Sequence, residues 1–345
     1  MINIETLNLN SNYQKNELKD FLKKFDLTFD DSIDYSLVIR KDEEIIATAS
    51  KSKNIIKCFA IDDSLRGEGV TNTLVTTLLN KSFDEGVFHN FVFTKPLNED
   101  IFKGVGFKSI SKTDKVALLE IGMNSIDKTI DKIKTQLNWH ENKNNGLLIM
   151  NCNPFTLGHQ FLIEYASEKM DNILILVVEE DKSSFPFNDR IELVRKGTSH
   201  LSNVTVLPST EYVISSATFP NYFLRKEDDS LLEFMKLDTL ITAEHFCSKL
   251  NINTRFVGEE PYCRITQKYN ETMIETFKNF NLNVSIIPRK VMGEKAISAS
   301  RVRELLKNNE LEELKTLVPQ STFEYLNSEK GKEIAERIKH SDSVH

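Results

Sequence analysis

Residues 150–159 read MNCNPFTLGH and lie between an apolar, strand-like run and a helical pattern. The apolar run covers residues 147–150, the helical pattern covers 158–170, and a second apolar run follows at 172–178. Strand, turn, helix and strand in this order build a parallel sheet with a right-handed crossover. We therefore predict a Rossmann-like α/β domain in which residues 151–159 form a turn of the kind that binds ligands.

The residue types in this turn suit a phosphate group. Pro154 ends the strand, and Gly158 allows a ligand to approach the backbone closely. His159 enters the first helical turn, where unpaired N–H groups and the positive end of the helix favour an anion. The alternative is a plain Asn-Pro turn with His159 in solvent, but the position after a buried strand favours the phosphate site.

A second segment, residues 295–306, reads KAISASRVRELL and begins another helix. Two serines, Ser298 and Ser300, open this helix, and Arg301 and Arg303 follow in its first turns. Arginines there oppose the helix dipole at a cost of roughly 0.3–1 kcal/mol each, and a bound polyphosphate would reverse that sign. A capped surface helix with ordinary arginines is an equally good interpretation of this segment alone.

The two segments together resemble the nucleotidyltransferase superfamily related to cytidylyltransferases. Residues 156–159, TLGH, match its (His/Thr)-x-Gly-His signature, and residues 297–303, ISASRVR, match Ile-Ser-x-(Ser/Thr)-x-x-Arg. The glycine and phenylalanine that open the first signature are replaced here by Met150 and Cys152.

The superfamily resemblance implies that the domain binds ATP, and it suggests roles for single residues. Thr156, His159 and Arg303 would be catalytic, and Ser298 and Ser300 would hold the phosphates. Arg190 resembles a further arginine of the superfamily that contacts phosphate. An arginine paired with Asp189 or Glu192 of its own helix is an equal alternative.

More narrowly, several segments resemble the citrate lyase ligase family over most of the chain. They are NPFTLGHQ (153–160), ATFPNYF (217–223), VGEEP (257–261) and YN (269–270). The resemblance implies that acetate and ATP give acetyl-adenylate and pyrophosphate, and that the acetyl group then passes to a thiol. That thiol belongs to the coenzyme-A-like prosthetic group on the acyl carrier subunit of citrate lyase. Asn153, Phe155, Gly158 and Gly258 would help to bind the nucleotide, and Mg²⁺ would arrive with the ATP.

The first part of the chain has a different pattern, with strand-like runs at 36–40, 44–49, 55–61, 88–94 and 116–121 and a helical run at 71–83. This predicts an α+β domain. Residues 65–71, LRGEGVT, and 101–107, IFKGVGF, resemble the GCN5-related acetyltransferase fold, in which Arg66, Gly67 and Gly69 would hold a pyrophosphate of coenzyme A type. A simple turn between strand and helix is the alternative. We interpret the domain as a docking site for the prosthetic arm rather than as an independent acetyltransferase.

The polar run ENKNNG at residues 141–146 predicts the domain boundary. We expect an acetyltransferase-like domain at residues 1–122, a helix and linker at 123–145, a ligase domain at 146–330 and a tail at 331–345, with poor order after Ser328.

Composition excludes several classes of function. The 345 residues carry a formal net charge of -7, which does not favour general binding to nucleic acid. We expect a cytoplasmic protein without a membrane segment, because the N-terminal residues lack a signal-peptide pattern and the longest apolar run is short. The four cysteines have no C-x-x-C spacing, so neither a disulfide framework nor a zinc site is expected.

Two other functions stay open at this point. The same two motifs would serve an adenylyltransferase that makes a dinucleotide cofactor of the NAD or dephospho-coenzyme A type. A protein of another class, an N-acetyltransferase with a regulatory nucleotide-binding half, would also fit. Exchange of pyrophosphate into ATP separates these possibilities. Dependence on acetate favours the ligase, dependence on a mononucleotide or phosphopantetheine favours the dinucleotide adenylyltransferase, and no exchange favours the acetyltransferase.

Overall fold

The computed structural model describes residues 3–65, 69–137, 139, 143–179, 183–213, 227–259, 264–292 and 295–340. Three of the sequence features discussed above therefore lie outside the described residues: Arg66 with Gly67, the segment 217–223, and residues 260–261.

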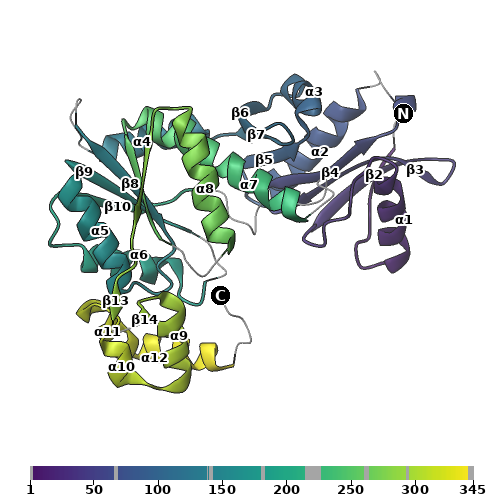
Figure 1. Ribbon diagram of the computed structural model, residues 1–345. Coiled ribbons are helices and arrows are strands. Elements are labelled where there is room, and N and C mark those ends of the chain that lie inside the picture. The colour runs from purple at the N-terminus through teal and green to yellow at the C-terminus, as the bar shows by residue number, and fades with distance from the viewer. Residues whose placement is uncertain are drawn as a thin grey trace. The chain divides into compact units, whose positions relative to one another are not determined.

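The chain divides into two compact units (Figure 1). Unit 1 comprises Met1–Thr129 and Ser216–Ile241, and unit 2 comprises Ile130–Ser215 and Thr242–His345. This differs from the sequence-based division, which places all of residues 146–330 in one domain. The difference is α7 (Glu227–Ile241), which packs against β6 of unit 1. No local sequence pattern reveals such a contact between segments so far apart.

Unit 1 contains a seven-stranded sheet in the order β1-β2-β3-β4-β5-β7-β6. Neighbouring strands pair antiparallel, except that β4 and β5 pair parallel. The α+β class predicted for this part is confirmed. The strands are β1 (Ile4–Thr6), β2 (Tyr35–Lys41), β3 (Glu44–Ser52), β4 (Ile55–Ile61), β5 (His89–Thr94), β6 (Lys108–Lys112) and β7 (Ala117–Gly122).

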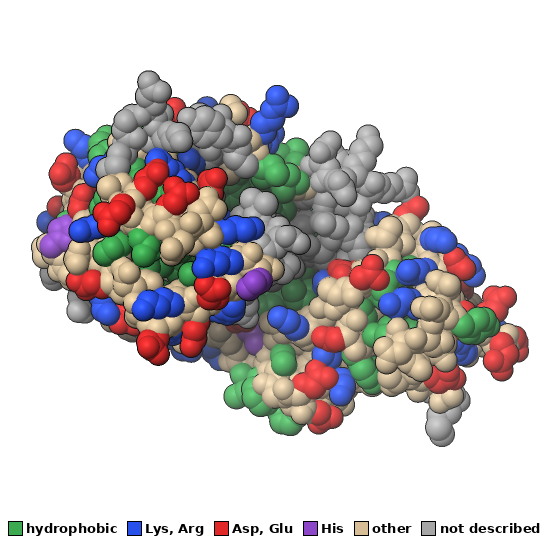
Figure 2. Space-filling model, turned by 90° about the horizontal axis from the view of Figure 1, so that it is seen from below, with side chains coloured by type: hydrophobic (Ala, Val, Ile, Leu, Met, Phe, Trp, Pro, Cys, Tyr) green, Lys and Arg blue, Asp and Glu red, His purple; other side chains and the backbone are tan. Residues whose placement is uncertain are grey.

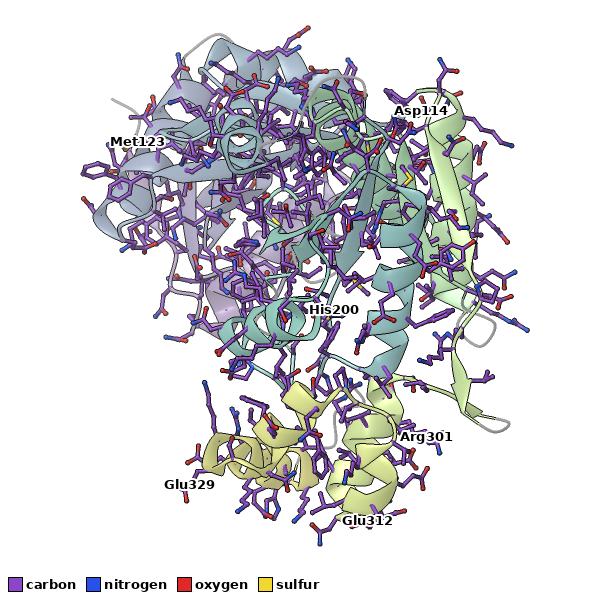
Figure 3. The ribbon with its side chains drawn as sticks, turned by 90° about the vertical axis from the view of Figure 1, so that its left-hand side faces the viewer. Asp114, Met123, His200, Arg301, Glu312 and Glu329 are labelled. Atoms are coloured by element: carbon purple, nitrogen blue, oxygen red, sulfur yellow. The ribbon has the colours of Figure 1, made fainter. Side chains whose placement is uncertain are left out.

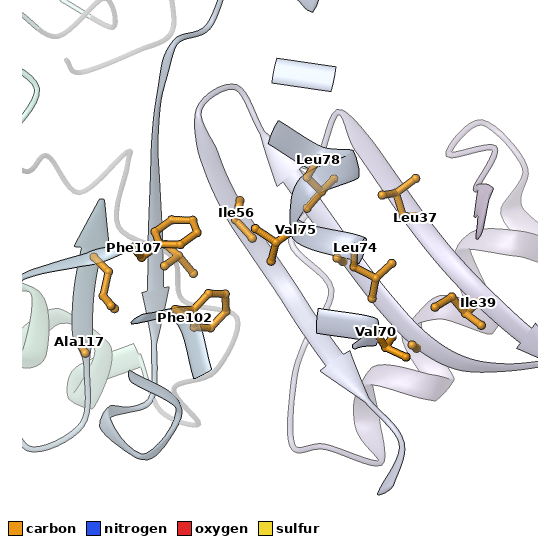
Figure 4. Close-up of a cluster of buried hydrophobic side chains, with 14 residues drawn as sticks. Leu37, Ile39, Ile56, Val70, Leu74, Val75, Leu78, Phe102, Phe107 and Ala117 are labelled. Atoms are coloured by element: carbon orange, nitrogen blue, oxygen red, sulfur yellow. The ribbon is translucent and has the colours of Figure 1, made fainter. Parts of the chain in front are cut away.

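Helix α2 (Val70–Asp84) forms the centre of the core of unit 1. Its buried residues Val70, Leu74, Val75 and Leu78 recur three or four positions apart and therefore share one face. Figure 4 shows this face together with apolar side chains of the sheet, such as Leu37 of β2. The other described helices of the unit are α1 (Asn12–Lys23), α3 (Glu99–Gly104), α7 and two short 3₁₀ helices, η1 (Asp63–Leu65) and η2 (Pro96–Asn98).

Unit 2 contains a five-stranded sheet in the order β10-β9-β8-β11-β12, and every neighbouring pair is parallel. The predicted parallel sheet is confirmed. Its strands are β8 (Asn145–Met150), β9 (Asn172–Val177), β10 (Val204–Pro208), β11 (Thr254–Gly258) and β12 (Asn283–Ile287). Its described helices up to residue 278 are α4 (Ile126–Gln136), which begins in unit 1, α5 (Leu157–Lys169), α6 (Phe187–Gly197), the π-helix η3 (Thr242–Cys247) and α8 (Arg264–Lys278).

The strand order creates a topological switch point beside β8. From β8 the chain continues to β9 and β10 on one side, and it later returns to β11 and β12 on the other side. In open parallel sheets, ligands bind in the crevice outside the carboxyl ends of the strands at such a point. The turn at residues 151–156 follows β8 at this position.

Four helices complete unit 2: α9 (Ala299–Asn308), α10 (Leu311–Lys315), α11 (Gln320–Asn327) and α12 (Glu329–Lys339). They share a core that includes Val302, Leu314 and Ile334 (yellow in Figure 1). The prediction of poor order after Ser328 is therefore wrong for residues 329–339. Helix α12 buries few apolar residues, so its own sequence indicates little packing. It is ordered by contacts with α9 and α11, which the local sequence does not predict.

Acidic and basic side chains are mixed on the face of the molecule that Figure 2 displays. No helix among the described residues is both long and apolar enough to cross a membrane.

Candidate active site

The turn after β8 is held in a tight shape. Cys152 has a positive φ of 53°, and the bond between Asn153 and Pro154 is cis. Burial raises the pKa of the Cys152 thiol to about 12, so this cysteine stays protonated. The turn ends at Thr156, whose hydroxyl accepts a hydrogen bond from the His159 N–H and caps helix α5.

His159 completes a capping box with Thr156. Its Nδ1 accepts the backbone N–H of Thr156 at 3.1 Å, and its ring stacks on Phe155 with centroids 5.9 Å apart. Burial, together with the positive charge of Arg289, lowers the pKa of the imidazole to about 4. The ring is therefore neutral at pH 7. Because Nδ1 is the acceptor, the proton of the neutral ring lies on Nε2, which is then a hydrogen-bond donor.

The structure brings the two sequence motifs into contact. A Cβ added at Gly158 would lie 3.0 Å from the carbonyl oxygen of Ile297, a tighter contact than most side chains make, so glycine favours this close approach. The Arg303 side chain donates to the carbonyl oxygen of Asn153 at 2.6 Å. These contacts place the start of α9 beside the start of α5.

The second motif is arranged around the N-terminus of α9. The Ser298 hydroxyl caps the helix by accepting the Arg301 N–H at 3.2 Å, and Ser300 is exposed in its first turn. The two arginines differ in direction, because Arg301 pairs with Glu313 of α10 whereas Arg303 contacts the turn after β8. Figure 3 labels Arg301 on α9 and Glu312, the neighbour of Glu313, on α10. Burial lowers the pKa of the Arg303 guanidinium, which nevertheless stays charged at pH 7.

Arg190 lies beneath the turn. It is fully buried, and its Nη1 donates to Val178 and to the carbonyl and side-chain oxygens of Asn151, each at 2.7 Å. Its Nε donates to the Phe185 carbonyl at 3.0 Å. These bonds give Arg190 a structural role in shaping the turn. Direct contact between Arg190 and phosphate stays a prediction.

Asn153 and Phe155 also support the turn from within. The Asn153 side chain accepts the Phe185 N–H at 3.0 Å, and the Phe155 ring packs so closely on Gly197 of α6 that a Cβ there would lie 2.3 Å from it. Their side chains are buried. Both residues position the backbone that leads to His159.

Gly258 ends β11 on the other side of the switch point. A Cβ added there would meet nothing within 4 Å, so the space beside this backbone is open. The Gly258 carbonyl accepts the Asn270 side chain at 3.4 Å.

Sequence reasoning missed Arg289. Its Nε donates to the Glu259 carbonyl at 2.9 Å, immediately after β11, and its charge contributes to the lowered pKa of His159. The signal was present, because Arg289 and Lys290 follow the fifth strand of the parallel sheet at the edge where ligands bind.

A separate cavity of about 580 Å³ lies in unit 1. Strands β4 and β5 pair at two positions, Ile55 with Phe91 and Ile56 with Val92. The cavity lies where the strands continue after these pairs, and it is lined by residues 59–61 of β4 and 92–94 of β5. The N-terminus of α2 also lines it, where Gly69 caps the helix with a positive φ of 71°. The exposed side chains of Leu97 and Ile101 belong to the same lining.

Among the described residues, no group of three or more His, Cys, Asp or Glu side chains could hold a metal ion.

Similarity to known proteins agrees with this site. The family model of the citrate lyase ligase C-terminal domain matches residues 145–326, which include both motifs. The [citrate [pro-3S]-lyase] ligase of Escherichia coli is 36% identical over 316 residues, covering 90% of this chain and 89% of that protein. The chain belongs to the citrate lyase ligase family. The Haemophilus influenzae member is 37% identical over 319 residues, covering 90% of this chain and 94% of that protein.

Other similarities cover less of the chain. The phosphopantetheine adenylyltransferase of Clostridium botulinum is 41% identical over 56 residues, which is 16% of this chain and 35% of that protein. Among solved structures, a GNAT-family acetyltransferase from Staphylococcus aureus aligns with a TM-score of 0.30 at 14% identity, covering 36% of this chain and all of that chain. The GNAT domain of PAT from S. lividans aligns with a TM-score of 0.28 at 15% identity, covering 35% of this chain and 89% of that chain.

Proposed function

We propose that this protein is an ATP-dependent ligase that acetylates the prosthetic-group thiol of the citrate lyase acyl carrier subunit. The observation that carries the proposal is the contact between the two motifs at the switch point of the parallel sheet. Membership in the citrate lyase ligase family supports the same reaction.

In the first step, an oxygen of acetate attacks the α-phosphorus of ATP. The bond from that phosphorus to the bridging oxygen breaks, and pyrophosphate leaves with the electron pair. The Nε2–H of the neutral His159 and the N–H groups at the start of α5 would donate to phosphate oxygens. Ser298, Ser300 and Arg303 would hold the departing pyrophosphate beside them.

In the second step, the thiol gives up its proton to solvent and its sulfur attacks the acetyl carbonyl carbon. The bond from that carbon to the phosphate oxygen breaks, AMP leaves with the electron pair, and a thioester forms. No covalent intermediate with the enzyme is required. The buried and protonated Cys152, the cysteine in the turn, is consistent with this. Mg²⁺ would arrive with ATP through the phosphate oxygens, which is how it commonly binds. No residue of the protein is assigned as a ligand of Mg²⁺. The cytoplasmic location of the protein stays a prediction.

Exchange of labelled pyrophosphate into ATP tests the first step. We expect exchange to depend on acetate, because the acyl-adenylate must form reversibly. Exchange that depends instead on nicotinamide mononucleotide or phosphopantetheine would favour a dinucleotide adenylyltransferase. The short match to a phosphopantetheine adenylyltransferase is the observation that keeps this alternative. A complete lack of exchange would favour an acetyltransferase with a regulatory nucleotide-binding half.

Unit 1 would dock the thiol-bearing prosthetic arm. The cavity between β4 and β5 supports this role, because it opens beside the N-terminus of α2, where backbone N–H groups favour a pyrophosphate. Its apolar residues, such as Leu97 and Phe102, suit the uncharged part of the arm. The contributions of Arg66 and Gly67 stay predictions.

The variant Gly69→Ala tests the docking role. A Cβ at its positive φ strains the turn before α2, so we expect a higher KM for the carrier subunit and unchanged pyrophosphate exchange. Gly86→Ala is the matched control, because Gly86 follows the other end of α2 with a φ of 78° and has equally open surroundings. Equal effects of the two variants on the carrier KM would remove docking from this turn.

A further inference from the structure

The segment that follows β12 brings a positive charge to the carboxyl edge of the sheet in unit 2. The Glu259 N–H donates to the Ile287 carbonyl at 2.8 Å, which continues the pairing of β11 and β12 beyond Gly258. The Arg289 Nε then donates back to the Glu259 carbonyl at 2.9 Å. This bond fixes the guanidinium at the ends of both strands.

The same segment lies along the first turns of α5. The Lys290 carbonyl accepts the Ile297 N–H at 3.0 Å, and the Ile297 carbonyl lies against Gly158. The Lys290 ammonium stands 5.7 Å from the centre of the Phe161 ring on α5. Arg289 is thus bonded to the end of β11, its neighbour Lys290 reaches α5, and its charge acts on His159.

The charges around this turn explain why a further cation matters. His159 is neutral at pH 7, so it offers a hydrogen bond without a positive charge. Arg190 is committed to the oxygens of the turn from below, and Arg303, which donates to the Asn153 carbonyl, is assigned to the departing pyrophosphate. The α5 N-terminus contributes only about half an elementary charge, whereas the phosphates of ATP carry several negative charges.

We propose that Arg289 binds the same phosphate group of ATP as His159, supplying the positive charge while His159 supplies the directed N–H donor. This inference rests on the proposed function, because it assumes that ATP occupies the switch point. It assigns a substrate-binding role to a residue outside both sequence motifs.

The test compares Arg289→Gln with Lys290→Gln in the full-length protein. Each variant removes one positive charge, and the two residues are neighbours in the sequence. Arg289 is bonded to the end of β11, whereas Lys290 lies over the Phe161 ring. We expect Arg289→Gln to lower kcat/KM for ATP in acetate-dependent exchange by about 10²-fold, as for loss of one preorganised transition-state contact. Lys290→Gln should lower kcat/KM for ATP by less than about tenfold. Equal losses, or no loss in Arg289→Gln, would overturn the proposal.

A second readout separates binding from mere support of the fold. Titration of the His159 ring by NMR should show a higher pKa in Arg289→Gln than in the unaltered protein, because a nearby positive charge is lost. Arg289→Lys should keep the low pKa and recover part of the activity. Loss of activity in Arg289→Gln with an unchanged His159 titration would contradict the shared phosphate site.

The proposed function can fail separately. If the unaltered protein shows no acetate-dependent exchange, the ligase assignment falls, whichever way Arg289 behaves. If the unaltered protein is active and Arg289→Gln matches it, only the role of Arg289 falls.

Discussion

At the scale of single residues, the structure adds to the predicted phosphate-facing position of His159 that its ring is a neutral donor. The sequence placed this residue correctly in the first turn of a helix, at the edge of a parallel sheet. It could not reveal the protonation state, because that depends on burial and on Arg289, a residue far along the chain. Likewise, the buried position of Arg190 depends on carbonyl groups from several segments.

We expect His159→Ala to reduce acetate-dependent exchange by about 10²–10³, the usual effect of removing one preorganised donor. The fold should be weakened only modestly, because the variant loses the bond from the Thr156 N–H to Nδ1 but keeps the Thr156 cap. Exchange kinetics and thermal unfolding measure the two effects. His200→Ala is the control, since His200 is a half-exposed histidine that contacts Glu164 on the surface. Near-normal exchange in His159→Ala would refute the assignment.

The low pKa of His159 also predicts a dependence of stability on pH. The imidazole titrates near 6.5 when unfolded and at about 4 when folded, so between these values the unfolded chain binds more protons. Its contribution to the free energy of unfolding is therefore complete above pH 6.5 and is lost as the pH falls toward 4. The stability difference between the unaltered protein and His159→Gln, measured by denaturant unfolding, should shrink over this window. A constant difference across the window would show that His159 is not buried in the neutral form.

At the scale of secondary-structure elements, two helix N-termini meet at one edge of the unit 2 sheet. The sequence was sufficient for most of these elements, because the periodic patterns of β8, α5 and β9 and the serine cap of α9 are local features. Their contact is not local. The Gly158–Ile297 approach depends on how α9 returns to the sheet after β12.

This close approach predicts the effect of Gly158→Ala. The new Cβ would lie 3.0 Å from the Ile297 carbonyl oxygen, so the backbone just before α9 must move slightly away from α5. We expect the KM for ATP to rise and the exchange rate to fall, while binding of the carrier to unit 1 is unchanged. Gly104→Ala in α3 is the control, because a Cβ there meets nothing within 4 Å. If Gly158→Ala leaves ATP use intact, the two motifs need not stay in contact for activity.

At the scale of the whole molecule, neither unit is a continuous stretch of sequence. The sequence predicted two domains of the correct classes, but the return of residues 216–241 to unit 1 depends on contacts between α7 and β6. Met235 and Leu237 are almost fully buried in this helix, and Thr113 donates its hydroxyl to Glu233. Periodicity indicates a helix but not which sheet it packs against.

This arrangement predicts how a truncated chain behaves. A fragment of residues 144–345 would expose the apolar face of α7, because unit 1 is missing. We expect this fragment to aggregate and to unfold at a lower temperature than the same fragment with residues 216–241 replaced by a long Gly/Ser linker. The linker version should keep acetate-dependent exchange. Light scattering and thermal unfolding compare the two, and greater stability of the unmodified fragment would contradict the assignment of α7 to unit 1.

The interruption of unit 1 between residues 129 and 216 also sets the order in which the protein is completed on the ribosome. Strand β6 lies at the edge of its sheet, and it emerges long before the helix that packs against it. Until α7 has been synthesised, the nascent chain therefore carries an edge strand without this neighbour, which is a surface prone to pairing with other chains. Pausing of translation before residue 241 should thus make the protein depend on chaperones that protect emerging polypeptides.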